Sequence, residues 1–411
     1  MKTVFIILFV LVLLVRFLLR QLNIKQLRQH GHEVPRGFES AIDSETLKKT
    51  ADYTLAKDRL DAVESIVDTV LSGLFLFTPL FLWYDQFIVS FGYGFIVQGL
   101  AYFLLLGLVQ GVVGIPFSLY RNFVLEEKFG FNTMTLKLWF TDLVKGTFLS
   151  LVIAGLLMGG VFALIFYSPQ WWWLWVWMFV AIVTLFLMYL SPYVIEPLFF
   201  KFEPVQKEGL EEGVRAMAEK AGLTISKIQQ VDASRRSRHG NAYFTGIGKV
   251  KRIVLFDTLL EKLSINEALA VLAHEIGHWK KGHIWKRLVK TEVVSLLMFF
   301  FSWYILQQGW LPSLLGLEEL SFFGQLIILG FAASILFFPL APLSSWFSRR
   351  DEWQADAFAC DLHGQPNDLA TALVNMSRDN LANLHPHPLY AWFYYSHPAL
   401  AERVGRLRDR R

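Results

Sequence analysis

Long apolar stretches separated by polar segments run along most of the chain. A helix needs about 20 mainly apolar residues to cross a bilayer, so each stretch of about that length predicts a membrane span. We identify seven, at residues 3–19, 66–89, 95–118, 147–167, 171–191, 291–308 and 322–343. The pattern therefore predicts a mainly α-helical protein that crosses the lipid bilayer seven times.

The first apolar stretch resembles the core of a secretory signal peptide. Such a peptide ends at small residues where it is cleaved, whereas residues 4–15 are followed by Arg16-Phe-Leu-Leu-Arg20. We therefore expect this stretch to be retained as the first span.

Composition and charge support a membrane protein. Charged residues make up 18% of the chain, against about 25% in a typical soluble domain. The connections after the first, third and fifth spans carry Lys25, Arg121 and Lys201 among other cations. The connections without Lys or Arg are residues 91–94, 168–170 and 307–321. Because Lys and Arg accumulate in cytoplasmic connections, we expect the N-terminus outside and the C-terminus in the cytoplasm. The topology explains the basic excess of the chain, so we expect no nucleic-acid partner.

The longest polar stretch, about residues 200–290, is expected on the cytoplasmic side. Residues 208–222 have the periodicity of an amphipathic helix, and residues 225–231 and 241–256 that of strands with a turn at 246–248. Ser264 and Glu267 have the spacing of a capping box, which predicts a helix that begins there and runs past Lys281.

This helix contains the sequence His274-Glu-Ile-Gly-His278. At 3.6 residues per turn the two histidines share one helix face and can bind one metal ion, and Glu275 lies about 100° further round. Zinc suits two imidazoles, a carboxylate and a water. Cys360 is the only cysteine, which excludes a cysteine-rich site. The alternative is a pair of histidines whose hydrogen bonds are satisfied by neighbouring residues.

A third ligand is expected after the last span. Glu352 and Asp356 are four residues apart and share a helix face. One can bind the metal while the other orients a ligand imidazole, and the spacing favours Glu352 as the ligand without excluding Asp356. The alternative is a solvated acidic face beside Arg349 and Arg350.

His397 and Arg403 are further candidates. An imidazole and a guanidinium near the metal can stabilise the oxyanion of a tetrahedral transition state. A surface helix with Pro398 in its first turn explains the same residues equally well.

Several motifs in combination make the chain resemble the type I CAAX prenyl proteases, a family of integral-membrane zinc metallopeptidases. The similarity runs over nearly the whole length. The matching stretches include Leu19-Arg-Gln21, Glu126-Glu-Lys-Phe-Gly-Phe-Asn132, Gly240-Asn-Ala-Tyr-Phe244, Lys251-Arg-Ile-Val-Leu-Phe-Asp-Thr-Leu-Leu260, His274-Glu-Ile-Gly-His-Trp-Lys-Lys-Gly-His283, Ser348-Arg-Arg-Asp-Glu-Trp-Gln-Ala-Asp-Ala-Phe-Ala359 and Tyr395-Ser-His-Pro398.

The resemblance implies one Zn²⁺ per chain, bound by His274, His278 and Glu352. It implies that Glu275 is the general base and that Asp356 supports a zinc-bound histidine.

The resemblance also implies the roles of residues around the zinc. His397 and Arg403 would act on the substrate carbonyl, and Asn241 and Ala242 would lie on an edge strand that pairs with an extended substrate. The implied fold is a barrel of seven transmembrane helices around a large chamber, capped by a cytoplasmic zinc protease domain with a small β-sheet.

The expected organisation has four parts. Residues 1–199 hold spans one to five, residues 200–290 the zinc protease domain, residues 291–343 spans six and seven, and residues 344–411 the part with the third ligand. The resemblance implies that the substrates are peptides or proteins, prenylated ones included, that are cut near the C-terminus. We expect a monomer.

Two other functions fit the same pattern. A membrane quality-control protease would share the zinc site and cut unprenylated membrane proteins. A non-catalytic scaffold is disfavoured, because every ligand and the base are present. The short connection at residues 307–321 favours a prokaryotic homologue, in a bacterial inner membrane rather than the endoplasmic reticulum.

Overall fold

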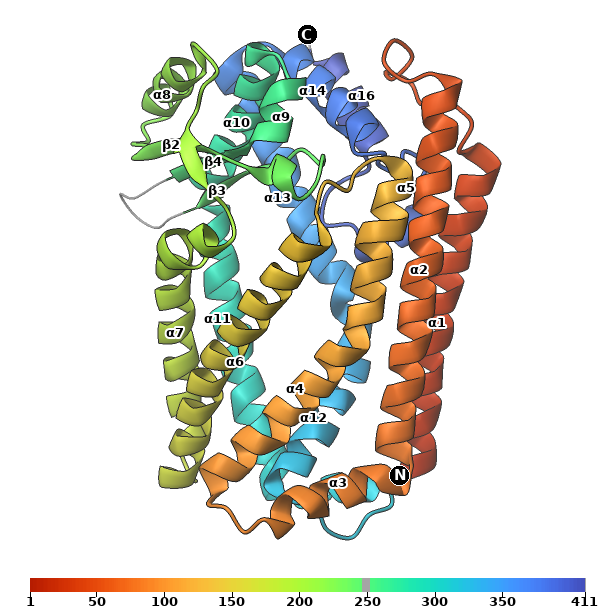
Figure 1. The fold of residues 1–411 in the computed structure, drawn as a ribbon, viewed down its shortest axis with the longest axis vertical. Helices are drawn as coiled ribbons and strands as arrows, with labels where there is room; N and C mark the ends of the chain where they lie inside the picture. Colours follow the sequence, from red (N-terminus) through yellow and green to blue (C-terminus); the bar gives the residue numbers. More distant parts are fainter. Residues whose placement is uncertain (246–251, 411) are drawn as a thin grey trace.

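Long helices dominate the structure, a computed structural model that describes residues 1–245 and 252–410. In this part of the chain six helices are long and apolar enough to cross a membrane, and the number rises to seven if one bent helix pair counts as a single span. Three of the six are α1 (Lys2–His30), α6 (Leu136–Tyr167) and α11 (His283–Gln307). The other three are continuous helical runs that begin with α4 (Phe95–Tyr120), α7 (Trp172–Val194) and α12 (Phe322–Phe337). They run roughly along the long axis of the molecule (Figure 1). The expected mainly helical membrane fold is confirmed.

The second expected span, 66–89, differs from a simple helix. It consists of α2 (Ser44–Phe77) and α3 (Pro79–Ser90), which are bent by 69°. Pro79 lacks a backbone N–H and disfavours the helical conformation of the preceding residue. Thr78 is accordingly extended, and its hydroxyl caps α3. As a result, α3 lies across the end of the helix bundle (Figure 1).

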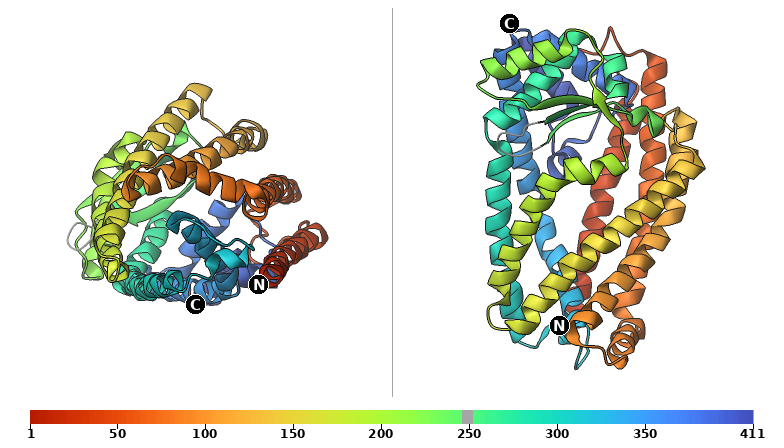
Figure 2. Two further views of the ribbon diagram at one scale, coloured as in Figure 1. Left: turned by 90° about the horizontal axis from the view of Figure 1, so that it is seen from below. Right: turned by 60° about the vertical axis from the view of Figure 1, so that its left-hand side comes forward.

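The helices form a ring when viewed along the bundle (Figure 2). In the apolar windows of the six long helices, at most 17% of the residues are buried inside the protein. Exposed apolar surface of this extent is characteristic of contact with lipid or another apolar environment.

Several helices continue beyond their apolar stretches. From α4 the chain passes through a π-helical turn, η1 (Arg121–Glu126), into α5 (Glu127–Phe129). From α12 it passes through η5 (Phe338–Leu340) into α13 (Ala341–His363). The last span thereby leads directly into the helix that carries Glu352.

A four-stranded sheet lies at the end of the molecule opposite α3. Its strands are β1 (Phe202–Pro204), β2 (Lys227–Val231), β3 (Ala242–Thr245) and β4 (Arg252–Phe256). The order is β1-β2-β4-β3, with β2 and β4 parallel and the other pairs antiparallel, so β3 is at one edge. The turn expected at 246–248 lies outside the described residues.

The helices around the sheet form the main core of this polar part. Ile253 and Leu255 of β4 pack with apolar side chains of α8 and α10. The helices here are α8 (Leu210–Lys220), α9 (Asp257–Lys262), α10 (Ile265–Lys280), α14 (Pro366–Asp379), α15 (Pro388–Tyr394) and α16 (Leu400–Asp409). The expected capping box is present: Ser264 and Glu267 bond each other's backbone N–H groups at the start of α10.

Close contact between α10 and α13 brings the metal-ligand candidates together. At Gly277 a Cβ atom would lie only 3.1 Å from the Cα and the carbonyl oxygen of Ala355. The absence of a side chain therefore allows the two backbones to approach, which places Glu352 opposite the histidines of α10.

Candidate metal centre

Three ligand groups converge between α10 and α13. The Nε2 atoms of His274 and His278 are 3.2 Å apart. Each lies 3.3 Å from a carboxylate oxygen of Glu352. Within the described residues, this is the only group of three potential ligands whose atoms all lie within 4.8 Å of one another.

The donor set fits a zinc ion. Two imidazole nitrogens and a carboxylate oxygen are the ligands of many catalytic zinc sites, with bonds of about 2.0–2.2 Å. Oε2 of Glu352 is buried, with Nε2 of His274 at 3.3 Å and Nη1 of Arg403 at 3.8 Å. A cation bound between the three ligand groups would satisfy this oxygen. Glu352 is the carboxylate of the cluster, as the spacing favoured.

Asp356 lies behind His274. Its Oδ1 is 2.8 Å from Nδ1 of His274, which points Nε2 of that ring toward the cluster. Burial lowers the pKa of His274, but hydrogen bonds to Asp356 and Glu352 outweigh this effect and raise it to about 9. The same negative field favours a metal ion at Nε2.

Arg403 is buried and bound to Asp356. Its Nε and Nη2 donate to the two carboxylate oxygens of Asp356 at 2.9 and 2.6 Å. Its Nη1 is 3.8 Å from Oε2 of Glu352. Arg403 therefore fixes the orientation of Asp356 and adds positive charge beside the cluster.

Glu275 and His397 lie close to the same cluster. Burial raises the pKa of Glu275, and the positive charges of His274 and His278 oppose this rise in part. Nε2 of His397 is 3.5 Å from Oε1 of Glu352, and its side chain is 60% exposed. This imidazole is thus accessible from the open side of the cluster.

The edge strand β3 lies beside α10. The carbonyl of Asn241 accepts a hydrogen bond from Phe256 N, and Ala242 pairs with Leu255. The ring of Phe244 is 6.2 Å from that of Trp279, the residue after His278. The structure thus brings Asn241 and Ala242 to the sheet edge nearest the histidine helix.

A further histidine, His283, lies beside the cluster. Nδ1 of His278 lies 3.0 Å from Nδ1 of His283, whose Nε2 is 3.2 Å from Oε1 of Gln354. Gly282, with φ of 69°, makes the turn that brings His283 back toward His278.

Comparisons with known proteins agree with this geometry. Residues 204–411 match the family described as peptidase family M48. Residues 23–201 match the family described as CAAX prenyl protease N-terminal, five membrane helices. Together with the His-His-Glu cluster, these matches define an integral-membrane zinc metallopeptidase.

Within this class, the chain belongs to the CAAX prenyl protease 1 family. CAAX prenyl protease 1 of Saccharomyces cerevisiae is 35% identical over 91% of this chain and 88% of that protein. The human CAAX prenyl protease 1 homolog is 33% identical, with the same coverage. The crystal structure of S. mikatae Ste24p superposes with a TM-score of 0.87 at 32% identity and covers 96% of both chains. The family resemblance, the enzyme class and the fold expected from the sequence are confirmed.

Proposed function

We propose that this protein is a zinc endopeptidase that cuts prenylated proteins near their C-terminus. The observation that carries the proposal is the convergence of His274, His278 and Glu352 at the polar end of a ring of apolar helices. The relatives described as CAAX prenyl proteases support the substrate class. The helical ring offers an apolar environment for a lipid tail beside a polar site for the peptide.

The proposed reaction is hydrolysis by an activated water. The two histidines and Glu352 would hold one Zn²⁺, which when bound would supply Lewis acidity to the scissile carbonyl and to the water. Glu275 accepts a proton from the water as its oxygen bonds to the carbonyl carbon. Glu275 then delivers that proton to the amine nitrogen as the C–N bond breaks.

The remaining site residues position the reactants. We assign His397, and Arg403 through its Nη1, to the oxygen of the substrate carbonyl, where negative charge develops. Asp356 holds His274 in the orientation that a metal ligand needs. Asn241 and Ala242 are assigned to pairing with the extended substrate backbone by β-augmentation.

Comparison of two matched substrates tests the substrate class. The purified zinc-loaded protein is given a farnesylated peptide with a CAAX ending and the same peptide without the lipid. We expect cleavage of the farnesylated peptide three residues from its C-terminus, with the unprenylated peptide much slower. Equal or faster cleavage of the unprenylated peptide would favour the quality-control function instead.

The orientation in the membrane is also a proposal. The alternation of basic and uncharged connections supports an outside N-terminus and a cytoplasmic active site, and the short connection 307–321 supports a bacterial inner membrane. In a variant without Cys360, an impermeant thiol reagent on intact cells should label Gly92→Cys and leave Glu211→Cys unlabelled. The reverse pattern would invert the topology.

We further propose that the protein acts as a monomer. We also propose that its chain is organised in the four parts expected from the sequence, which are residues 1–199, 200–290, 291–343 and 344–411. A single chain contributes all the proposed site residues, which supports a monomeric enzyme. Light scattering of the detergent-solubilised protein, corrected for bound detergent, measures the oligomeric state directly.

A further inference from the structure

A basic pocket lies between α11 and α13 on the membrane side of the metal centre. Its volume is about 530 Å³. From α11 it is lined by Lys286, Arg287 and Lys290. From α13 it is lined by serines at positions 344, 345 and 348, by Gln354, and by residues near them.

The pocket adjoins the metal centre at two points. Gln354, which lines it, is 3.2 Å from His283, and His283 is 3.0 Å from the ligand His278. Ser396 also lines it, and its Oγ is 2.9 Å from Nδ1 of His397. The pocket is therefore connected to the metal centre by two short side-chain contacts.

The distance along α13 matches a short peptide. Ser348 and Ser345 precede Glu352 by four and seven residues, so all three share one helix face. At 1.5 Å per residue the two serines lie about 6 and about 10 Å along the helix from the metal ligand. Three extended residues span about 10 Å. The C-terminus of a tripeptide leaving group would thus reach the pocket.

The charge of the pocket favours an anion. Four cations line it, three on α11 and Arg350 on α13, against one carboxylate, Asp351. Nη2 of Arg287 makes two long contacts, at 3.5 Å to Asp351 and at 3.3 Å to Oγ of Ser348. Nζ of Lys290 lies 3.2 Å from the centre of the Phe347 ring, a neutral partner. The ammonium and guanidinium groups thus retain donors for a bound carboxylate.

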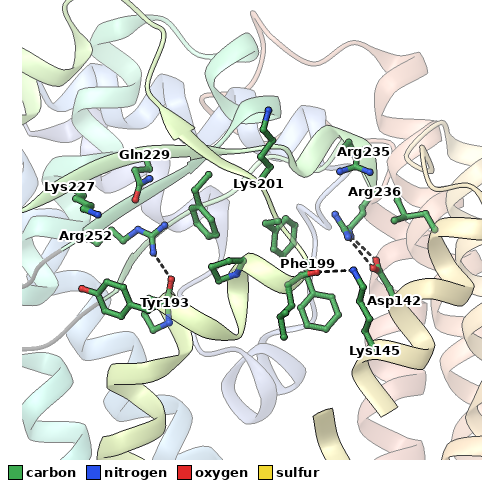
Figure 3. A pocket seen from close by; sticks show the side chains of 16 residues that line it. Asp142, Lys145, Tyr193, Phe199, Lys201, Lys227, Gln229, Arg235, Arg236 and Arg252 are labelled. Atoms are coloured by element: carbon green, nitrogen blue, oxygen red, sulfur yellow. Dashed lines mark hydrogen bonds and ion pairs between the residues drawn. The ribbon is translucent and has the colours of Figure 1, made fainter. Parts of the chain in front are cut away.

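In a second basic pocket, of about 550 Å³, the cations have shorter contacts (Figure 3). It lies between the sheet and the ends of α6 and α7. Its central cations already have partners within the protein. These pairs are Arg236 with the carboxylate of Asp142, Arg252 with the carbonyl of Pro192, and Lys145 with the carbonyl of Leu198.

We propose that the pocket between α11 and α13 binds the free C-terminal carboxylate of the substrate, with Arg287 and Lys290 as its main donors. The inference rests on the proposed function, because only cleavage close to a C-terminus brings a terminal carboxylate within reach. The pocket then sets the cut about three residues from the chain end. It distinguishes a C-terminal peptide from an internal segment.

A pair of peptides that differ only in terminal charge tests this inference. Both are farnesylated and have one sequence, and one ends in a free carboxylate while the other ends in a carboxamide. For the wild type we expect kcat/KM to favour the acid by about tenfold or more, as for a hydrogen bond to a charged group. In Lys290→Gln and in the Arg287→Gln/Lys290→Gln double variant, this ratio should fall toward one.

Two matched variants serve as controls. Lys290→Arg retains the positive charge and should retain the preference for the acid. Lys227→Gln removes an exposed cation from the second basic pocket (Figure 3) and should leave the ratio at its wild-type value.

The outcomes separate this inference from the proposed function. If the wild type cuts both peptides equally, or if the double variant keeps the full preference, the carboxylate site is rejected and the proposed function stands. If the enzyme cuts an unprenylated membrane protein but neither farnesylated peptide, both the proposed function and the carboxylate site are rejected.

Discussion

Glu275 lies between the two histidines of α10 in sequence, and its carboxylate is not one of the three converging ligand groups. Burial raises its pKa, which indicates that it accepts a proton more readily than a surface glutamate. Glu275→Gln keeps the side-chain volume and removes the proton acceptor. We expect peptide hydrolysis to fall by about 10²- to 10⁴-fold with zinc retained. Cleavage assays and elemental analysis measure the two effects, and turnover at the wild-type rate would rule out this base.

Glu352 and Asp356 should differ in their effect on metal content. Glu352→Ala removes a ligand, so we expect the purified protein to lose its zinc. Asp356→Asn removes the negative charge behind His274 and should weaken zinc binding by about 10- to 100-fold. Zinc titration with a competing chelator measures both. Full zinc occupancy in Glu352→Ala together with zinc loss in Asp356→Asn would make Asp356 the ligand.

Residue-scale prediction succeeded where helix geometry alone fixes the answer. The spacing of His274 and His278 places both on one face of any α-helix. The choice between Glu352 and Asp356 depends on how α13 is rotated against α10. It also depends on Arg403, which lies 47 residues beyond Asp356 in the chain and binds it. Local spacing carries no information about such a distant partner.

At the scale of elements, the contact between α10 and α13 controls the site. Ala is usually better than Gly in a helix by about 1 kcal/mol. At Gly277, however, the added Cβ would meet the backbone of Ala355 at 3.1 Å, and backbone cannot rotate away. We therefore expect Gly277→Ala to destabilise the protein by about 1–3 kcal/mol and to weaken zinc binding.

Gly405→Ala is the matched control for that substitution. Gly405 also lies in a helix, α16, and an added Cβ would meet nothing within 4 Å. We expect this variant to be at least as stable as the wild type, as measured by thermal unfolding and zinc titration. A stabilised Gly277→Ala variant would show that α10 and α13 can separate without cost.

The spans themselves were predictable, because each is a run of apolar residues with a length set by the bilayer. Two features of the helices were not. The bend between α2 and α3 depends on Pro79, and a proline in a span is often accommodated without breaking it. The polar continuations, such as α13, have no apolar pattern to mark them and are held by packing against α10 and α15.

At the scale of the whole molecule, a hydrogen-bonded network joins the helical ring to the polar domain. Tyr53 of α2 donates to Glu126 of η1 at 2.8 Å, and Glu126 lies 3.1 Å from Nε2 of His239. Nδ1 of His239 is 3.2 Å from Oδ1 of Asn380, which also accepts from Gly240 N. Gly240 precedes Asn241, so the network runs from the membrane helices to the edge strand.

Glu126→Ala should therefore act on both stability and substrate binding. It leaves Tyr53, which is buried, and His239, which is partly exposed, without their shared acceptor. A buried polar group without a partner costs about 1–3 kcal/mol. We expect a lower Tm and a higher KM for peptide substrates, because the segment before β3 loses its support, while zinc content stays unchanged. Glu127→Ala is the control, because that carboxylate is exposed and contacts Asn132 instead. A loss of stability with an unchanged KM would mean that the network supports the fold alone and has no influence on the edge strand.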